Sequence, residues 1–153
     1  MKKFTVIGAG LAGCEAAWQI AEAGYEVTLF EMKPEKFSPA HKNKNFAELV
    51  CSNSLKASRI DSAAGLLKEE MARLGSLTVP VARNCAVPAG GALAVDRNEF
   101  SQTITDMINS HPNITVENKL VEKISLDDDE ILIIATGPLT EGKLGEAIQN
   151  LCG

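Results

Sequence analysis

A glycine-rich turn near the N-terminus constrains the fold of this chain more than any other feature of its sequence. Phe4–Ile7 is a short apolar run of strand length, residues 8–13 read GAGLAG, and Leu11–Glu22 has apolar residues four apart, as in a helix that Gly24 can end. A further strand-like segment, Tyr25–Glu31, follows. Together these segments predict a βαβ unit of about 30 residues, the length that a parallel crossover needs.

The spacing of the glycines fits a dinucleotide-binding turn. Gly8 allows the tight turn, Gly10 lets the backbone approach a pyrophosphate, and Gly13 allows close packing of helix on strand. The free N–H groups and partial positive charge of the helix N-terminus favour phosphate. Glu31 is placed to accept hydrogen bonds from an adenosine ribose and disfavours a 2'-phosphate. The alternative is a tight turn that binds no ligand.

Composition limits the class of protein. The chain has 153 residues, 45% hydrophobic and 23% charged, which fits one globular domain with its own core. Its apolar runs are shorter than the roughly 20 residues that span a bilayer. A net charge of -5 argues against a protein whose whole surface binds nucleic acid, so any RNA contact must be local.

The cysteine pattern argues against a metal site or a disulfide framework. The four cysteines have no CxxC or CxxxxC spacing, and the chain has two histidines. Free thiols suit a reducing cytoplasm, which is the expected location. The positions are Cys14, Cys51, Cys85 and Cys152.

The remaining segments predict an interrupted α/β domain. Residues 33–59 are rich in Pro, Asn, Ser and Lys and predict a basic, loop-rich excursion from the sheet, around 33–60. Asp61 is expected to cap a helix that Gly75 stops, and residues 80–91 to be irregular or an edge strand. The other expected elements are a helix capped by Asp96 with core side chains Phe100, Ile104, Met107 and Ile108, one or two strands within 114–124, an acidic turn at 127–129, and a buried parallel strand at 130–135.

The end of that last strand favours flavin over nicotinamide. In flavoproteins of the glutathione-reductase type an apolar strand ends in Ala-Thr-Gly near the flavin, and residues 131–137 repeat this pattern. The alternative is an ordinary strand-to-loop turn. The expected fold is therefore a Rossmann-like FAD-binding domain of the glutathione-reductase type, with a parallel sheet and flanking helices. The residues expected to bind the cofactor are Gly8, Ala9, Gly10, Leu11, Ala12, Gly13, Glu31, Met32 and Gly137.

Several longer segments resemble one enzyme family. They are GAGLAGCEAA at 8–17, FAELVCSNSLK at 46–56, GLLKEEM at 65–71, VPAGGALAVDR at 87–97 and ATGPLT at 135–140. These segments closely resemble the folate- and FAD-dependent tRNA (uracil-5-)-methyltransferases, the TrmFO family. The segments around Cys51 and Gly90 are more specific than the glycine turn.

The resemblance implies an activity, its cofactors and its partners. Members of this family take a one-carbon unit from methylenetetrahydrofolate, reduce it with flavin electrons supplied by NAD(P)H, and place a methyl group on a uridine of the tRNA T-loop. The family is longer than 153 residues, so the resemblance covers an N-terminal portion. A second, smaller domain, a further cysteine and the completion of the flavin domain would lie outside this chain, which is expected to be inactive alone.

Cys51 is the catalytic candidate that the resemblance implies. Its role would be thiolate chemistry on the uracil ring or contact with the flavin, and a buried structural cysteine is the alternative. Lys42, Lys44 and Lys56 would lower the pKa of its thiol if they are close in space. Arg97 suits a folate glutamate tail or an RNA phosphate, with surface ion pairing as the alternative.

Two other classes of function remain open from the residues. One is a general FAD-dependent oxidoreductase in which Cys51 is incidental or redox-active. The other is a flavin-binding module without catalysis. The missing CxxxxC spacing argues against a disulfide reductase.

Overall fold

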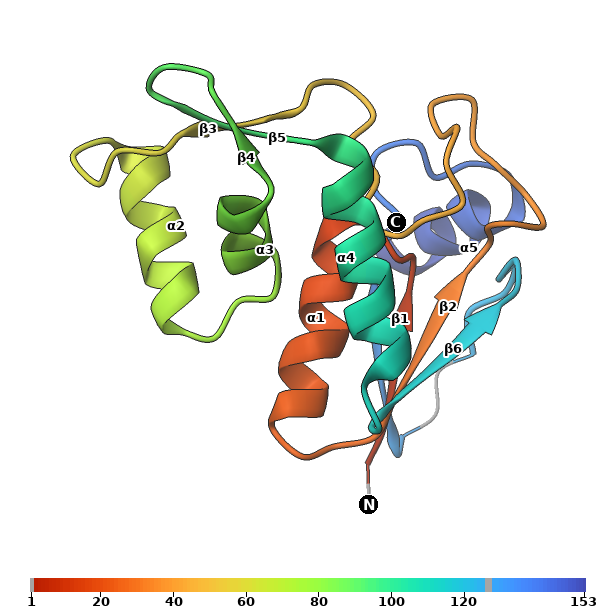
Figure 1. Ribbon diagram of the computed structural model, residues 1–153. Helices are drawn as coiled ribbons and strands as arrows, with labels where there is room; N and C mark the ends of the chain where they lie inside the picture. The colour runs from red at the N-terminus through yellow and green to blue at the C-terminus, as the bar shows by residue number, and fades with distance from the viewer. Residues whose placement is uncertain (1, 126–127) are drawn as a thin grey trace.

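A parallel four-stranded sheet forms the centre of the molecule (Figure 1). The computed structural model describes residues 2–125 and 128–153, so Asp127 of the expected acidic turn lies outside the described residues. The strand order is β6-β2-β1-β7, and each neighbouring pair is parallel. The strands are β1 (Lys3–Ile7), β2 (Val27–Glu31), β6 (Ile114–Asn118) and β7 (Glu130–Ile134).

The predicted βαβ unit is present, and one helix fills the crossover. Helix α1 (Leu11–Glu22) connects β1 to β2 and contacts both strands. Its buried residues are Gly13, Cys14, Ala17 and Ala21. Of the apolar residues expected on one stripe, four apart at Ala12, Ala16 and Ile20, the last two are partly buried against this core, whereas Ala12 is exposed.

A second long helix completes the core on the α1 side of the sheet. Helix α4 (Arg97–Ser110) buries Phe100, Ile104 and Ile108, as the sequence predicts, and contacts α1 and β6. The Asp96 carboxylate accepts hydrogen bonds from the Asn98 and Glu99 backbone N–H groups, so the predicted N-cap is confirmed. The Asp96 N–H donates to the Cys85 carbonyl, so Glu99 does not close the other half of a capping box.

The chain between β2 and α4 builds a second, smaller layer. Strands β3 (Ser54–Ala57), β4 (Ala86–Val87) and β5 (Ala92–Val95) form an antiparallel sheet in the order β3-β5-β4. Helices α2 (Ala63–Arg73) and α3 (Thr78–Asn84) lie beside it (Figure 1). The basic excursion is therefore irregular through residue 53 and ends in a strand.

Two expectations for this layer were wrong. Ser62, not Asp61, caps α2: its hydroxyl accepts from the Gly65 N–H, while Asp61 pairs with Arg59. Residues 80–91 were expected to be irregular or an edge strand, but residues 80–84 belong to helix α3; β4, at the edge of its sheet, fits the expectation. Pro80 lies in the first turn of α3, where a missing N–H costs no helical hydrogen bond.

One carboxylate joins the two layers. Glu15, on α1, accepts hydrogen bonds from the Leu77 and Thr78 backbone N–H groups and from the Ser76 and Thr78 hydroxyls. Burial opposes its ionisation, but the hydrogen bonds from Thr78, Gln19 and Ser76 outweigh that cost and hold the pKa of Glu15 below its usual 4.5. The ionised side chain therefore anchors the start of α3 to α1.

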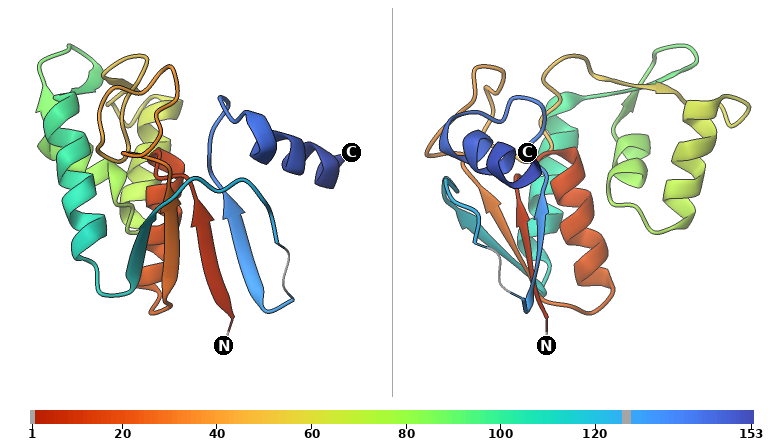
Figure 2. Two further views of the ribbon diagram at one scale, coloured as in Figure 1. Left: turned by 90° about the vertical axis from the view of Figure 1, so that its right-hand side faces the viewer. Right: turned by 180° about the vertical axis from the view of Figure 1, so that it is seen from behind.

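Strand β7 is parallel to β1 as predicted, but it is not buried. It is the last strand on its side of the described sheet, and Ile131 and Ile134 are each 37% exposed. Helix α5 (Gly142–Cys152) follows and projects away from the carboxyl ends of the strands (Figure 2). Among the described residues, no helix is long and apolar enough to cross a membrane.

Candidate functional site

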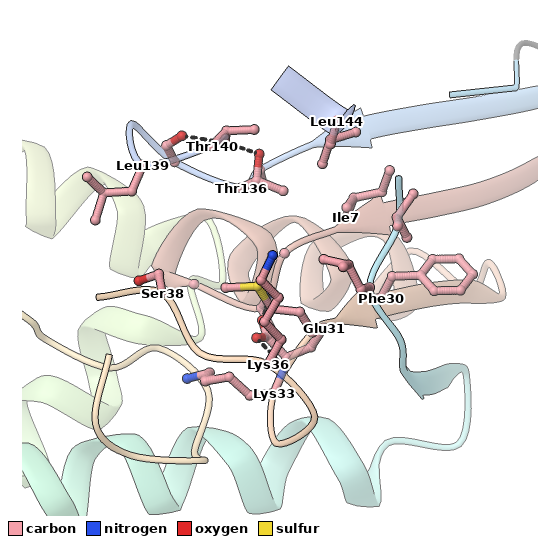
Figure 3. Close-up of a pocket in the computed structure, with 18 of the residues that line it drawn as sticks. Ile7, Phe30, Glu31, Lys33, Lys36, Ser38, Thr136, Leu139, Thr140 and Leu144 are labelled. Atoms are coloured by element: carbon pink, nitrogen blue, oxygen red, sulfur yellow. Dashed lines mark hydrogen bonds between the residues drawn. The ribbon is translucent and has the colours of Figure 1, made fainter. Parts of the chain in front are cut away.

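A cavity of about 480 Å³ lies at the carboxyl ends of β1, β2 and β7 (Figure 3). Strand β2 lies on one side of β1 and strand β7 lies on the other. The order of the strands therefore reverses at β1. Open parallel sheets bind their ligands at such a switch point. The walls come from the glycine turn, the end of β2, several residues between 36 and 50, residues 119–122 after β6, and the segment from the loop after β7 to the start of α5.

The glycine turn presents open backbone to this cavity. A Cβ atom on Gly13 would lie 1.7 Å from the Gly8 carbonyl oxygen, so the turn tolerates no side chain there. A Cβ atom on Gly10 would meet nothing within 4 Å, and the φ of Gly10 is -74°, which any residue can adopt. Among the described residues, no side chain caps the N-terminus of α1. Space and unsatisfied N–H groups at the start of α1 therefore face the cavity.

Glu31 closes the turn from the end of β2. Its carboxylate accepts hydrogen bonds from the Ala9 N–H (2.8 Å) and the Lys33 N–H (3.0 Å), and the residue is 6% exposed. A carboxylate has about four acceptor sites, so one on each oxygen is left for a ligand. Glu31 thus has a structural role that the sequence did not reveal, besides lining the cavity together with Met32.

A buried lysine organises the loop that forms one wall. Lys33 is 3% exposed, and its ammonium group donates to the Asn43 and Asn45 carbonyls. It also lies 3.7 Å from Glu48 Oε2. Glu48 Oε1 in turn accepts from the Lys42 and Asn43 backbone N–H groups. Sequence reasoning missed this pair, because the two residues are fifteen positions apart within a segment without periodicity.

The loop after β7 forms the opposite wall. Gly137, with a φ of +77°, lines the cavity together with Thr136 and Thr140. The Thr140 hydroxyl donates to the Gly137 carbonyl at 2.8 Å, so the Thr136 hydroxyl is the donor in the 2.6 Å bond between the two threonines. These bonds fix the loop that carries Gly137.

The structure brings all the expected cofactor-binding residues except Gly13 to the cavity lining, and Gly13 shapes the turn from behind. The expected catalytic residue lies apart from them. Cys51 is exposed and does not line the cavity, although its neighbour Val50 does. The buried-cysteine alternative for Cys51 is therefore wrong.

The other thiols and His41 have distinct surroundings. Cys14 and Cys85 are buried, and burial is the main cause that raises the pKa of both thiols, that of Cys14 to about 12. Neither thiol is suited to act as a thiolate near neutral pH. His41 lines the cavity, and its Nδ1 forms a 2.6 Å hydrogen bond with the Ser38 hydroxyl. Among the described residues, no group of His, Cys, Asp and Glu could hold a metal ion.

Curated relatives share most of this chain. The protein named methylenetetrahydrofolate--tRNA-(uracil-5-)-methyltransferase TrmFO from Enterococcus faecalis is 58% identical over 152 residues, which is 99% of this chain and 34% of that protein. Proteins of the same name are 58% identical in Desulfitobacterium hafniense, over 35% of their length, and 54% identical in Aquifex aeolicus, over 34%. The chain thus spans about a third of the length of the curated relatives it matches.

Solved structures share its fold at low sequence identity. Aquifex aeolicus GidA in its form I crystal aligns with a TM-score of 0.71 and 15% identity, covering 89% of this chain and 25% of that one. The p-nitrophenol 4-monooxygenase PnpA from Pseudomonas putida DLL-E4 aligns with a TM-score of 0.56 and 18% identity, covering 84% and 34%. These likenesses confirm the Rossmann-like α/β fold.

The match to a family model spans nearly the whole described chain. The model described as glucose inhibited division protein A, GIDA, matches residues 3–148, from the first strand into α5. This range includes the glycine turn, Glu31 and the loop after β7. The chain therefore belongs to the GIDA family.

Proposed function

We propose that this chain forms the flavin-binding part of an enzyme that methylates a uridine of the tRNA T-loop to 5-methyluridine. The carbon donor would be methylenetetrahydrofolate, and NAD(P)H would supply the electrons. The observation that carries the proposal is the 58% identity, over 99% of the chain, to a protein named as a methylenetetrahydrofolate-dependent tRNA (uracil-5-)-methyltransferase. The enzyme would act in the cytoplasm, where its tRNA substrate is found.

The residues at the cavity fit FAD. The open space before Gly10 and the uncapped start of α1 suit a pyrophosphate, and the free acceptor sites of Glu31 suit the ribose hydroxyls. Ala9, Leu11, Ala12, Met32 and Gly137 would complete the contacts. A bound flavin would supply the electrons that reduce the one-carbon unit.

Cys51 is the proposed catalytic residue, as nucleophile or as flavin contact. Its thiol is exposed beside a wall of the cavity, so a substrate base can reach it. Carbon 5 of uracil is a poor nucleophile, and addition of a thiolate to the ring would activate it. The proton that the thiol releases has to pass to solvent or a nearby base.

The decisive experiment is an anaerobic assay of the whole protein. It combines methylenetetrahydrofolate, NADH or NADPH and an unmodified tRNA transcript, and it reads 5-methyluridine by nucleoside mass spectrometry. We expect a yellow flavin spectrum and one methylated uridine in the T-loop, which is lost when that uridine is replaced by cytidine.

Other results would support the other classes of function. Oxidation of NAD(P)H without 5-methyluridine would favour a general FAD-dependent oxidoreductase. A flavin spectrum without either reaction would favour a binding module without catalysis.

A further inference from the structure

A second cavity lies on the other side of the loop, residues 36–50, that lines the first cavity. Its volume is about 590 Å³, and it lies between residues 42–49 and the first turn of α4. The Asn45 side-chain amide donates to Gln102 Oε1 (3.0 Å), and the Phe46 N–H donates to the Thr105 hydroxyl (2.8 Å). These bonds hold the loop against α4. The lining residues are Phe37, Lys42, Asn43, Lys44, Glu48, Leu49, Arg97, Asn98 and Ser101.

Cations without carboxylate partners line this cavity. The side chains of Lys42, Lys44 and Arg97 form no ion pair with any residue in the described ranges, and Arg97 makes a single weak bond, to the Leu49 carbonyl at 3.4 Å. The lining carboxylate, Glu48, is paired with buried Lys33. The cavity is therefore cationic in a protein whose net charge is -5.

The positive charge of the second cavity comes from side chains and not from the N-terminus of α4. Asp96 already accepts from the Asn98 and Glu99 N–H groups, and its carbonyl accepts from the Phe100 N–H. The other arginines of the chain, Arg59, Arg73 and Arg83, differ from Arg97 because each forms an ion pair, the first with Asp61 and the other two with Glu69. Arg97 keeps most of its donors for another ligand.

We propose that this cavity binds a backbone phosphate of the RNA substrate. The planar guanidinium of Arg97 suits two phosphate oxygens, and Lys42 and Lys44 would add point charges at the exposed rim. Phe37 and Glu48 line both cavities, so RNA held at the second cavity would lie beside the proposed cofactor site. This inference rests on the proposed RNA substrate.

The distribution of positive charge around the cavity favours RNA over the carboxylates of a folate tail. Lys42 and Lys44 are exposed and alternate along an irregular segment, so their charges spread along the surface. A nucleic-acid strand carries one negative charge per nucleotide and can engage several such cations at once. Release of the counterions from these phosphates would make binding depend on salt.

The test measures the salt dependence of RNA binding by the whole protein. The probe is a tRNA T-arm stem-loop, and the variants are Arg97→Gln, Lys44→Gln and Lys42→Gln. For each variant we expect weaker binding and a slope of log Kd against log salt that is smaller by about 0.7 to 0.9. Flavin content should stay unchanged. Lys123→Gln, an exposed lysine outside both cavities, is the matched control.

Other outcomes would overturn the proposal. An unchanged slope in all three variants, with methylation of RNA by the unmodified protein intact, would refute the phosphate site and leave the proposed function standing. A raised KM for polyglutamylated methylenetetrahydrofolate with unchanged RNA binding would assign the cavity to the folate tail instead. If the unmodified protein neither binds the stem-loop nor methylates tRNA, the proposed function itself fails.

Discussion

At the scale of single residues, Gly10 offers a test of cofactor binding that leaves the fold intact. A valine side chain there would meet no protein atom at its Cβ and would fill the space in front of the start of α1. We expect Gly10→Val to fold normally and to lose most of its bound FAD, measured as the ratio of flavin to protein absorbance. Gly91→Val is the control, because Gly91 also has open space but lies outside the cavity. Full flavin content in Gly10→Val would contradict the pyrophosphate assignment.

Cys51 gives the second prediction at this scale. Because the residue is exposed, Cys51→Ala removes little packing, and we expect the whole protein to keep its fold and most of its FAD while methyl transfer falls below detection. Cys51→Ser should also be inactive, since a hydroxyl is far less ionised near neutral pH. Cys152→Ala, at the other exposed cysteine, should remain active. Single-turnover methylation by either Cys51 variant would exclude a catalytic thiol.

At the scale of elements, Glu15 couples α1 to the start of α3. Replacing its carboxylate with an amide turns charge-assisted hydrogen bonds into neutral ones and leaves a donor facing the Leu77 and Thr78 N–H groups. We expect Glu15→Gln to weaken this junction by about 1–2 kcal/mol, which is a 5- to 30-fold faster hydrogen exchange at those two amides. Glu22→Gln, on the same helix but bonded to His111, should leave their exchange unchanged.

The effect of Glu15 should depend on pH in one direction. Because its pKa in the folded protein lies below the usual 4.5, its stabilising contribution is present above about pH 4.5 and is lost as the pH falls through the lowered value. The difference between the unmodified protein and Glu15→Gln should therefore shrink under acid conditions. A constant difference from pH 7 to pH 3 would contradict this assignment.

At the scale of the whole molecule, the described chain holds one cofactor-type cavity and spans about a third of its curated relatives. We expect the isolated 153-residue chain to show no methyl transfer although it contains Cys51, because the contacts to folate and nicotinamide are expected elsewhere. The measurement is 5-methyluridine formation by the isolated chain beside the whole protein at equal flavin concentration. Robust turnover by the isolated chain would contradict the expectation that contacts essential for methyl transfer lie elsewhere.

Local patterns were sufficient for the parallel sheet and its main helices. The glycine turn, the apolar strands and the Asp96 cap each act within a few residues, so the sequence alone predicts β1, α1, β2 and α4. The resemblance in turn indicated the family. Pro80 misled the prediction for α3, because proline inside a helix breaks it. Here the helix begins at Thr78, so Pro80 lies in the first turn, where proline is tolerated.

Only the tertiary structure decided which charges meet. The hydrogen bond of Thr78 to Glu15, the ion pair of Lys33 with Glu48, and the placement of unpaired Lys42 and Arg97 in one cavity join segments without a shared period, so no spacing predicts them. Buried charges require partners, and packing of the loop and α3 against the helices supplies these partners. The sequence by itself determined the sheet and the place of the cofactor turn, because these depend on local backbone geometry; the walls of both cavities depend on contacts between distant segments.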